Sequence, residues 1–107
     1  MKRYSSFKFL GYPENLSALK NKEVVAPVHI RIKPTNICNH DCWYCAYHVS
    51  SLQLGSEMEY RDTIPKEKME EIADDLISMG VKAVTFSGGG EPLLYKHLPG
   101  IMKKLSN

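Results

Sequence analysis

The feature that most constrains this sequence is a short run that holds all three cysteines, Cys38, Cys42 and Cys45, in the spacing C-x3-C-x2-C. It follows a strand-like stretch, residues 28–33, and a turn at residues 34–36. Three thiolates on one tight loop hold three corners of an iron–sulfur cube, and the fourth iron is then left without a protein ligand. An open coordination site lets a substrate or cofactor reach the metal. The spacing therefore favours an iron–sulfur cluster with one accessible iron.

Two other interpretations of the cysteines stay open. Zinc usually takes four protein ligands in paired clusters, and here His40 or His48 would have to supply the fourth. His40 lies inside the loop, which makes its reach back to a metal held by its neighbours difficult. The other alternative is three unrelated buried thiols. Such thiols are usually scattered along a chain, whereas these lie together in one segment.

A glycine-rich segment, Ser87 to Pro92, follows downstream and reads SGGGEP. The cysteine spacing, with the aromatic Tyr44 just before the last cysteine, resembles the signature of the radical S-adenosylmethionine (radical SAM) superfamily. The glycine-rich segment is similar to the glycine-glycine-glutamate segment that follows the second barrel strand in that family. The ordered pair of motifs is more specific than either motif alone.

The resemblance implies a 4Fe–4S cluster held by Cys38, Cys42 and Cys45, with S-adenosylmethionine bound to the remaining iron. In that family one electron from the reduced cluster cleaves the cofactor to methionine and a 5′-deoxyadenosyl radical, which abstracts hydrogen from the substrate. The implied partners are an electron donor such as flavodoxin or ferredoxin and a small-molecule or peptide substrate of unknown identity. The alternative is a non-catalytic iron–sulfur or zinc-binding fragment that needs a partner or the remainder of a barrel.

The residues expected to bind the cofactor come from both motifs. Glycines let a backbone approach a ligand closely, a glutamate accepts charge-assisted hydrogen bonds from an ammonium group, and a proline stiffens a turn. A phosphate-binding loop is disfavoured because G-x-x-x-x-G-K-[ST] is absent and a glutamate would repel phosphate; a plain glycine turn stays open. The expected cofactor-binding residues are Tyr44, which the family places near the adenine, and Gly88, Gly89, Gly90, Glu91 and Pro92.

Hydrophobic periodicity predicts a strand, a helix and a second strand in succession. Residues 28–33 alternate, with Val28, Ile30 and Ile32 on one face and His29, Arg31 and Lys33 on the other. Residues 64–79 carry a single apolar stripe, with Thr63 near the N-cap, Pro65 in the first turn and Gly80 at the end. A second strand covers residues 81–87. This order implies parallel strands joined by a right-handed crossover, with the polar strand face turned to a solvated lumen.

We therefore expect an α/β fold: the first βα units of a partial (βα)6 TIM-like barrel with parallel strands, apparently truncated. Residues 1–26 are expected to form an amino-terminal extension, with a short helix opened by residues 13–15 and an extended piece at Val24 and Val25. The resemblance implies that residues 27–107 form the amino-terminal portion of a radical SAM core, and we expect a further helix to begin near Leu98. The long loop between Cys45 and the first crossover helix is expected to cover the cluster.

Composition narrows the possible partners. The 107 residues carry a net charge of +2 without a basic run, which gives no indication of nucleic-acid binding. No stretch is apolar for long enough to span a bilayer, and no signal-peptide core follows the first residues. An odd number of clustered cysteines suits a reducing compartment, so we expect a cytoplasmic protein that does not bind a membrane.

Overall fold

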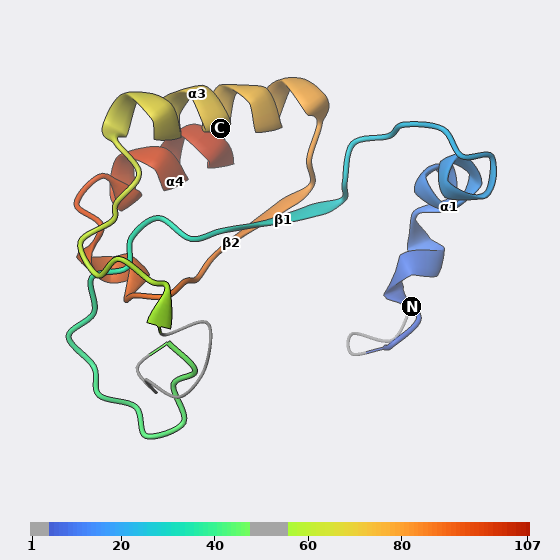
Figure 1. Cartoon of the computed structure of the whole chain (residues 1–107). Helices are drawn as coiled ribbons and strands as arrows, with labels where there is room; N and C mark the ends of the chain where they lie inside the picture. Colours follow the sequence, from blue (N-terminus) through green and yellow to red (C-terminus); the bar gives the residue numbers. More distant parts are fainter. Residues whose placement is uncertain (1–4, 48–55) are drawn as a thin grey trace.

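The computed structural model describes residues 5–47 and 56–107. Within these residues, two strands and three α-helices carry the fold, together with two short 3-10 helices, η1 and η2; Figure 1 shows how the strands and helices are arranged. The α/β class is therefore confirmed. In chain order the elements are η1 (Lys8–Gly11), α1 (Pro13–Lys20), β1 (His29–Ile32), α3 (Lys66–Met79), β2 (Ala83–Phe86), η2 (Pro92–Leu94) and α4 (Leu98–Ser106).

The two strands pair side by side in the same direction. His29 lies opposite Ala83, and Ile32 lies opposite Phe86. The parallel pairing and the helical crossover between the strands are thus as predicted. Within the described residues the sheet is open and has two strands, so parallel βα pairing is observed and a closed barrel is not.

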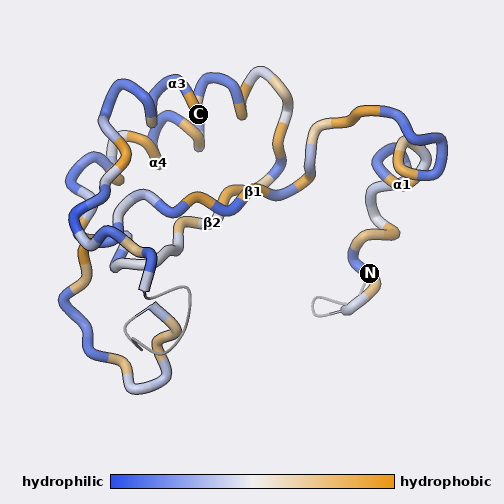
Figure 2. Tube along the Cα trace, in the orientation of Figure 1, coloured by the Kyte–Doolittle hydropathy of each residue, from blue (hydrophilic) through white to orange (hydrophobic). Residues whose placement is uncertain are grey.

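Helices α3 and α4 cover one face of the sheet (Figure 1). Hydrophilic and hydrophobic residues alternate along β1 (Figure 2), and its apolar residues Ile30 and Ile32 face the helices. Burying one such side chain stabilises a fold by roughly 1.5–3 kcal/mol, so this face anchors both strands. The buried core consists of Ile32, Met69, Leu76, Tyr95, Leu98 and Ile101.

The start of α3 differs from the prediction, which placed Pro65 inside the first turn. Pro65 is the N-cap, with φ −59° and ψ 151°, and the helix begins at Lys66. The two residues before Pro65 pair instead with residues that follow β1. The Ile64 N–H donates to the Pro34 carbonyl over 2.9 Å, and Thr63 forms a β-bridge with Thr35. The predicted end of the helix is confirmed, since Gly80 adopts the left-handed conformation with φ 74°.

The amino-terminal segment carries the predicted short helix, α1, which lies apart from α3 and α4 (Figure 1). The Asn15 side-chain amide donates to the Ala26 carbonyl over 2.9 Å and ties α1 to the residues that lead into β1. The extended piece predicted at Val24 and Val25 is not a strand, because it pairs with no neighbour and Val24 is fully exposed. The boundary between residues 26 and 27 stays a prediction. Across the described ranges, no helix is both long enough and apolar enough to cross a membrane.

Candidate functional site

Both sequence motifs lie at one edge of the sheet. β1 ends at Ile32 and leads into the cysteine loop, the segment that carries Cys38, Cys42 and Cys45. β2 ends at Phe86 and leads into the glycine-rich loop, residues 87–92. Because the strands are parallel, both loops leave the sheet at its carboxyl edge (Figure 1). In α/β sheets this edge is where ligands bind.

Backbone hydrogen bonds join the two loops. The Ser87 N–H donates to the Ile32 carbonyl over 2.9 Å, which continues the strand pairing past the end of β2. Further on, the Glu91 N–H donates to the Ile37 carbonyl over 2.9 Å, next to Cys38. The glycine-rich loop is therefore held against the stem of the cysteine loop by main-chain contacts that do not depend on side chains.

The three glycines permit this close approach. A Cβ on Gly90 would overlap the Ile37 carbonyl oxygen and lie 2.5 Å from the Asn36 carbonyl carbon. A Cβ on Gly89 would lie 2.6 Å from the Met58 sulfur and 2.9 Å from the Asn36 side-chain oxygen. Gly88 has φ 154°, a value that residues with side chains rarely adopt. A side chain is therefore disfavoured at Gly90 by nearby backbone and at Gly88 by the backbone conformation, whereas the atoms close to Gly89 belong to flexible side chains.

The cysteines are free thiols on one loop. Cys38, Cys42 and Cys45 are each half-buried, and the Cys45 N–H closes a turn onto the Cys42 carbonyl over 3.0 Å. Part of the following loop packs on this segment: the Tyr60 hydroxyl donates to the Cys38 carbonyl over 3.0 Å. This contact agrees with a covering role for that loop. Residues 48–55 of the loop, and with them His48, lie outside the described residues.

The cysteine loop supplies thiols as its candidate metal ligands. Within the described part of the chain, no three His, Cys, Asp or Glu side chains converge closely enough to hold one metal ion. A zinc site requires such convergence, whereas a 4Fe–4S cube binds its thiolates on different irons. Three partly accessible thiols on one loop are the type of donor that a 4Fe–4S cube takes, and the zinc alternative stays open because His48 lies outside the described residues.

The aromatic residues of the cysteine loop point outward. The side chains of Trp43 and Tyr44 are 89% and 71% exposed, and their rings meet edge to face with centroids 5.4 Å apart. Tyr47 accepts a hydrogen bond from the Lys33 ammonium group, which also lies 4.9 Å from the ring centroid. An adenine contact for Tyr44 stays a prediction.

Glu91 is held in place by both of its carboxylate oxygens. Oε1 accepts a hydrogen bond from the Leu93 N–H over 3.1 Å and caps η2, which Pro92 begins. Oε2 lies 3.4 Å from Nε2 of His40, in the middle of the cysteine loop. Sequence reasoning considered His40 only as a zinc ligand and missed this pair. No local pattern signals it, because it exists only where the two loops meet.

The face of the sheet opposite the helices carries the polar residues of β1. His29 and Thr85 come from neighbouring strands and share a hydrogen bond of 2.8 Å between Nε2 and Oγ1. Arg31 and Lys33 follow on the same side of the chain and are exposed. The predicted division of the strand into an apolar and a polar face is therefore confirmed.

Comparison with known proteins identifies the family. The sequence model of the radical SAM superfamily matches residues 32–107, which include both motifs, and the chain belongs to this superfamily. No solved structure gives a significant match.

The relatives include two proteins named GTP 3′,8-cyclase. The one from Hydrogenovibrio crunogenus is 31% identical over 77 residues, covering 72% of this chain and 22% of that protein. The one from Peptoclostridium acidaminophilum is 30% identical over 78 residues, covering 73% and 22%. An uncharacterized protein of Archaeoglobus fulgidus is 40% identical over 65 residues, covering 61% and 14%. The chain thus spans less than a quarter of the length of these relatives.

Proposed function

We propose that this chain forms the cluster- and cofactor-binding part of a radical SAM enzyme. Cys38, Cys42 and Cys45 hold a 4Fe–4S cluster in this proposal, and the glycine-rich loop binds S-adenosylmethionine. When bound, the reduced cluster supplies the electron that cleaves the cofactor and yields the hydrogen-abstracting 5′-deoxyadenosyl radical. A reduced flavodoxin or ferredoxin is the proposed electron donor.

The hydrogen bond between the Glu91 N–H and the Ile37 carbonyl is the observation that carries this proposal. It holds the cysteine loop and the glycine-rich loop together at the carboxyl edge of the sheet. In a glycine-lined cradle the backbone itself supplies hydrogen-bonding groups to a ligand, at distances that a side chain would prevent. The Glu91 carboxylate is an acceptor for the cofactor ammonium group, because its two oxygens offer more lone pairs than His40 and Leu93 use.

The polar face of the sheet is the proposed substrate side. His29, Arg31 and Lys33 lie in a row on β1 and the residue that follows it, and Lys33 reaches the cysteine loop through Tyr47. Positive charge in such a row attracts an anionic substrate. The two relatives named above are cyclases of GTP, an anionic nucleotide, and this agrees with an anionic substrate class.

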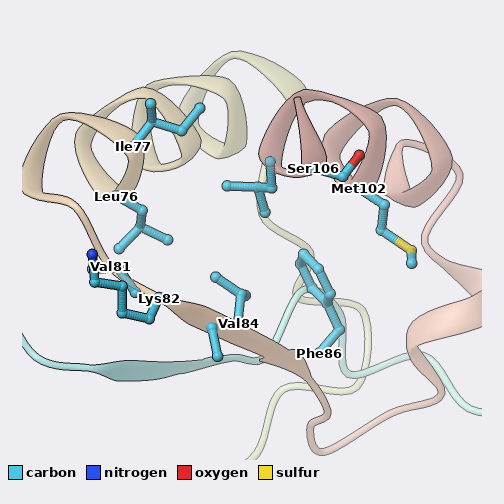
Figure 3. Close-up of a pocket in the computed structure, with 10 residues that line it drawn as sticks. Leu76, Ile77, Val81, Lys82, Val84, Phe86, Met102 and Ser106 are labelled. Carbon is cyan, nitrogen blue, oxygen red and sulfur yellow. The ribbon is translucent and has the colours of Figure 1, made fainter. Parts of the chain in front are cut away.

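A partial barrel completes the proposal. An apolar groove runs between β2 and the two helices, and Val84, Phe86 and Leu76 project into it (Figure 3). Leu105 of α4 lines the same groove. An open strand edge beside an apolar groove accepts a further strand, as the remaining βα units of a (βα)6 barrel would provide.

Anaerobic reconstitution tests the proposal. The chain is loaded with iron and sulfide, reduced and mixed with S-adenosylmethionine, and 5′-deoxyadenosine is then measured. Product that is absent in Cys42→Ala supports a radical SAM enzyme. If the electron paramagnetic resonance spectrum of the cluster does not change when S-adenosylmethionine is added, the result supports the alternative, a non-catalytic iron–sulfur fragment. A colourless protein that retains one zinc per chain contradicts both.

A further inference from the structure

The contact between His40 and Glu91 crosses from one cofactor motif to the other. His40 lies between Cys38 and Cys42, and its side chain is 57% exposed, whereas that of Glu91 is 24% exposed. Glu91 is the fixed partner, because its N–H is bonded to Ile37 and its Oε1 to the Leu93 N–H. His40 therefore brings the segment between Cys38 and Cys42 against a carboxylate that two other hydrogen bonds hold in place.

We propose that His40 is a positioning residue for the cofactor site. Through its contact with Oε2 of Glu91, at 3.4 Å, it holds the segment between Cys38 and Cys42 over the glycine-rich loop before any cofactor arrives. The proposal rests on the proposed function for the identity of the cofactors. It goes beyond that function because it assigns the placement of the segment between Cys38 and Cys42 to a residue that is neither a cluster ligand nor a cofactor-binding residue in that proposal.

The surroundings of the loop show why such a tie is needed. Trp43 and Tyr44 project into solvent and pack only on each other among the ring contacts of the described residues. The near end of the loop is held by Tyr60 at Cys38, and the far end by Lys33 at Tyr47. Between these two ends, His40 contacts Glu91 through its side chain and the Cys45 N–H bonds to the Cys42 carbonyl, so we expect the His40 contact to contribute to the position of Cys42.

The cofactor-free chain offers a direct test. Trp43 is the single tryptophan of the sequence and lies within the loop, so its fluorescence anisotropy reports the order of the loop. We expect His40→Ala to lower the anisotropy and His40→Gln, which retains a side-chain N–H donor, to keep it near the parent value. Asn39→Ala, at the exposed neighbouring position, is the matched control and is expected to change nothing. An anisotropy in His40→Ala equal to that of the parent overturns the proposal.

The loaded chain offers a second test with a different readout. After cluster reconstitution, the dissociation constant for S-adenosylmethionine is measured in His40→Ala, Glu91→Ala and the double variant. We expect His40→Ala to raise the constant by about two- to fivefold, the range of a weak contact between exposed side chains. In the Glu91→Ala background, the same change is expected to have no further effect. Independent, multiplicative effects, or tighter binding by His40→Ala, overturn the proposal.

The two tests separate this inference from the proposed function. If no cluster or S-adenosylmethionine binds, the proposed function fails, and the anisotropy of the cofactor-free chain still decides the role of His40. If both bind and His40→Ala behaves as the parent in both measurements, only the positioning role is wrong.

Discussion

The Gly90 backbone passes so close to the Ile37 carbonyl that a single added carbon atom would overlap it. The next residue, Glu91, donates its N–H to that same carbonyl over 2.9 Å. The Ile37 carbonyl is therefore one of the main-chain groups that set how closely the cysteine loop and the glycine-rich loop approach each other. Because this contact is made by main-chain atoms, substitution of most side chains leaves it intact, and the glycine is its sensitive point.

Gly90→Ala is expected to separate the two loops. The new Cβ meets backbone atoms of Asn36 and Ile37, which have little room to move, so we expect a loss of about 1–3 kcal/mol in the free energy of unfolding. Iron retained after reconstitution should also fall. Denaturant unfolding and iron analysis measure the two effects. Gly100→Ala is the matched control: its Cβ would meet nothing within 4 Å, and alanine favours α4 by roughly 0.5–1 kcal/mol.

Met69→Ala is expected to open a cavity in the layer that supports the site. The Met69 side chain is 0% exposed and belongs to the cluster that joins α3 to the sheet. Removing it should cost about 2–5 kcal/mol in the free energy of unfolding. Met79→Ala, on the same helix with the side chain 50% exposed, is the comparison and should cost far less. Equal losses in the two variants would contradict the packing described for α3.

Thr35→Val is expected to loosen the junction between β1 and the cysteine loop. The Thr35 hydroxyl is buried, shares a 2.8 Å hydrogen bond with the Thr63 hydroxyl and accepts one from the Ile37 N–H over 3.2 Å. Valine keeps the shape but leaves these groups without a partner, at a cost of about 1–3 kcal/mol. Thermal unfolding of Thr35→Val, Thr63→Val and the double variant measures the coupling. Strictly additive losses would show that the two hydroxyls do not interact.

The stability of the fold is expected to fall in alkaline solution through Tyr95. Burial raises the pKa of Tyr95 above its ordinary value of 10.0, and Glu67 and Glu70 raise it further. The folded chain therefore keeps this proton at a pH where the unfolded chain loses it. The resulting stabilisation is complete below pH 10.0 and is lost as the pH rises through the folded-state pKa.

Tyr95→Phe isolates this effect. The variant loses the hydrogen bond of 2.9 Å from the hydroxyl to the Ile64 carbonyl, which should cost about 1 kcal/mol near neutral pH. Its stability should then decline less steeply than that of the parent above pH 10.0. Denaturant unfolding at several pH values gives both quantities, and Tyr12→Phe, at an exposed position, is the control. Parallel pH curves for parent and Tyr95→Phe would count against this assignment.

The sequence was sufficient wherever a structural feature depends on a local period or on one special residue. The alternation at residues 28–33 predicted β1 and its two faces, and the apolar stripe predicted α3 with its end at Gly80. The two motifs predicted the family, because their residue types and order are themselves local. A helix between two successive strands in turn predicted that the strands are parallel and that the helix forms the crossover between them.

The sequence was insufficient wherever a contact joins distant segments. The bridge between Thr35 and Thr63 delays the start of α3, and no property of residues 63–65 alone signals that pairing. The pair of His40 and Glu91 likewise arises only after both loops have been placed by the sheet. In both cases tertiary contacts decided between local conformations of similar energy.

The cysteine loop and the glycine-rich loop are far apart along the sequence, and this separation has a consequence for the order of folding and metal binding. The strands that carry the loops become neighbours only after α3 has folded back across them, since parallel strands cannot be joined by a short hairpin. Early in folding, three thiols are present but their backbone counterpart is not. If the chain holds a cluster as proposed, iron captured at that stage would be held loosely, and firm retention of iron would report that the crossover has closed.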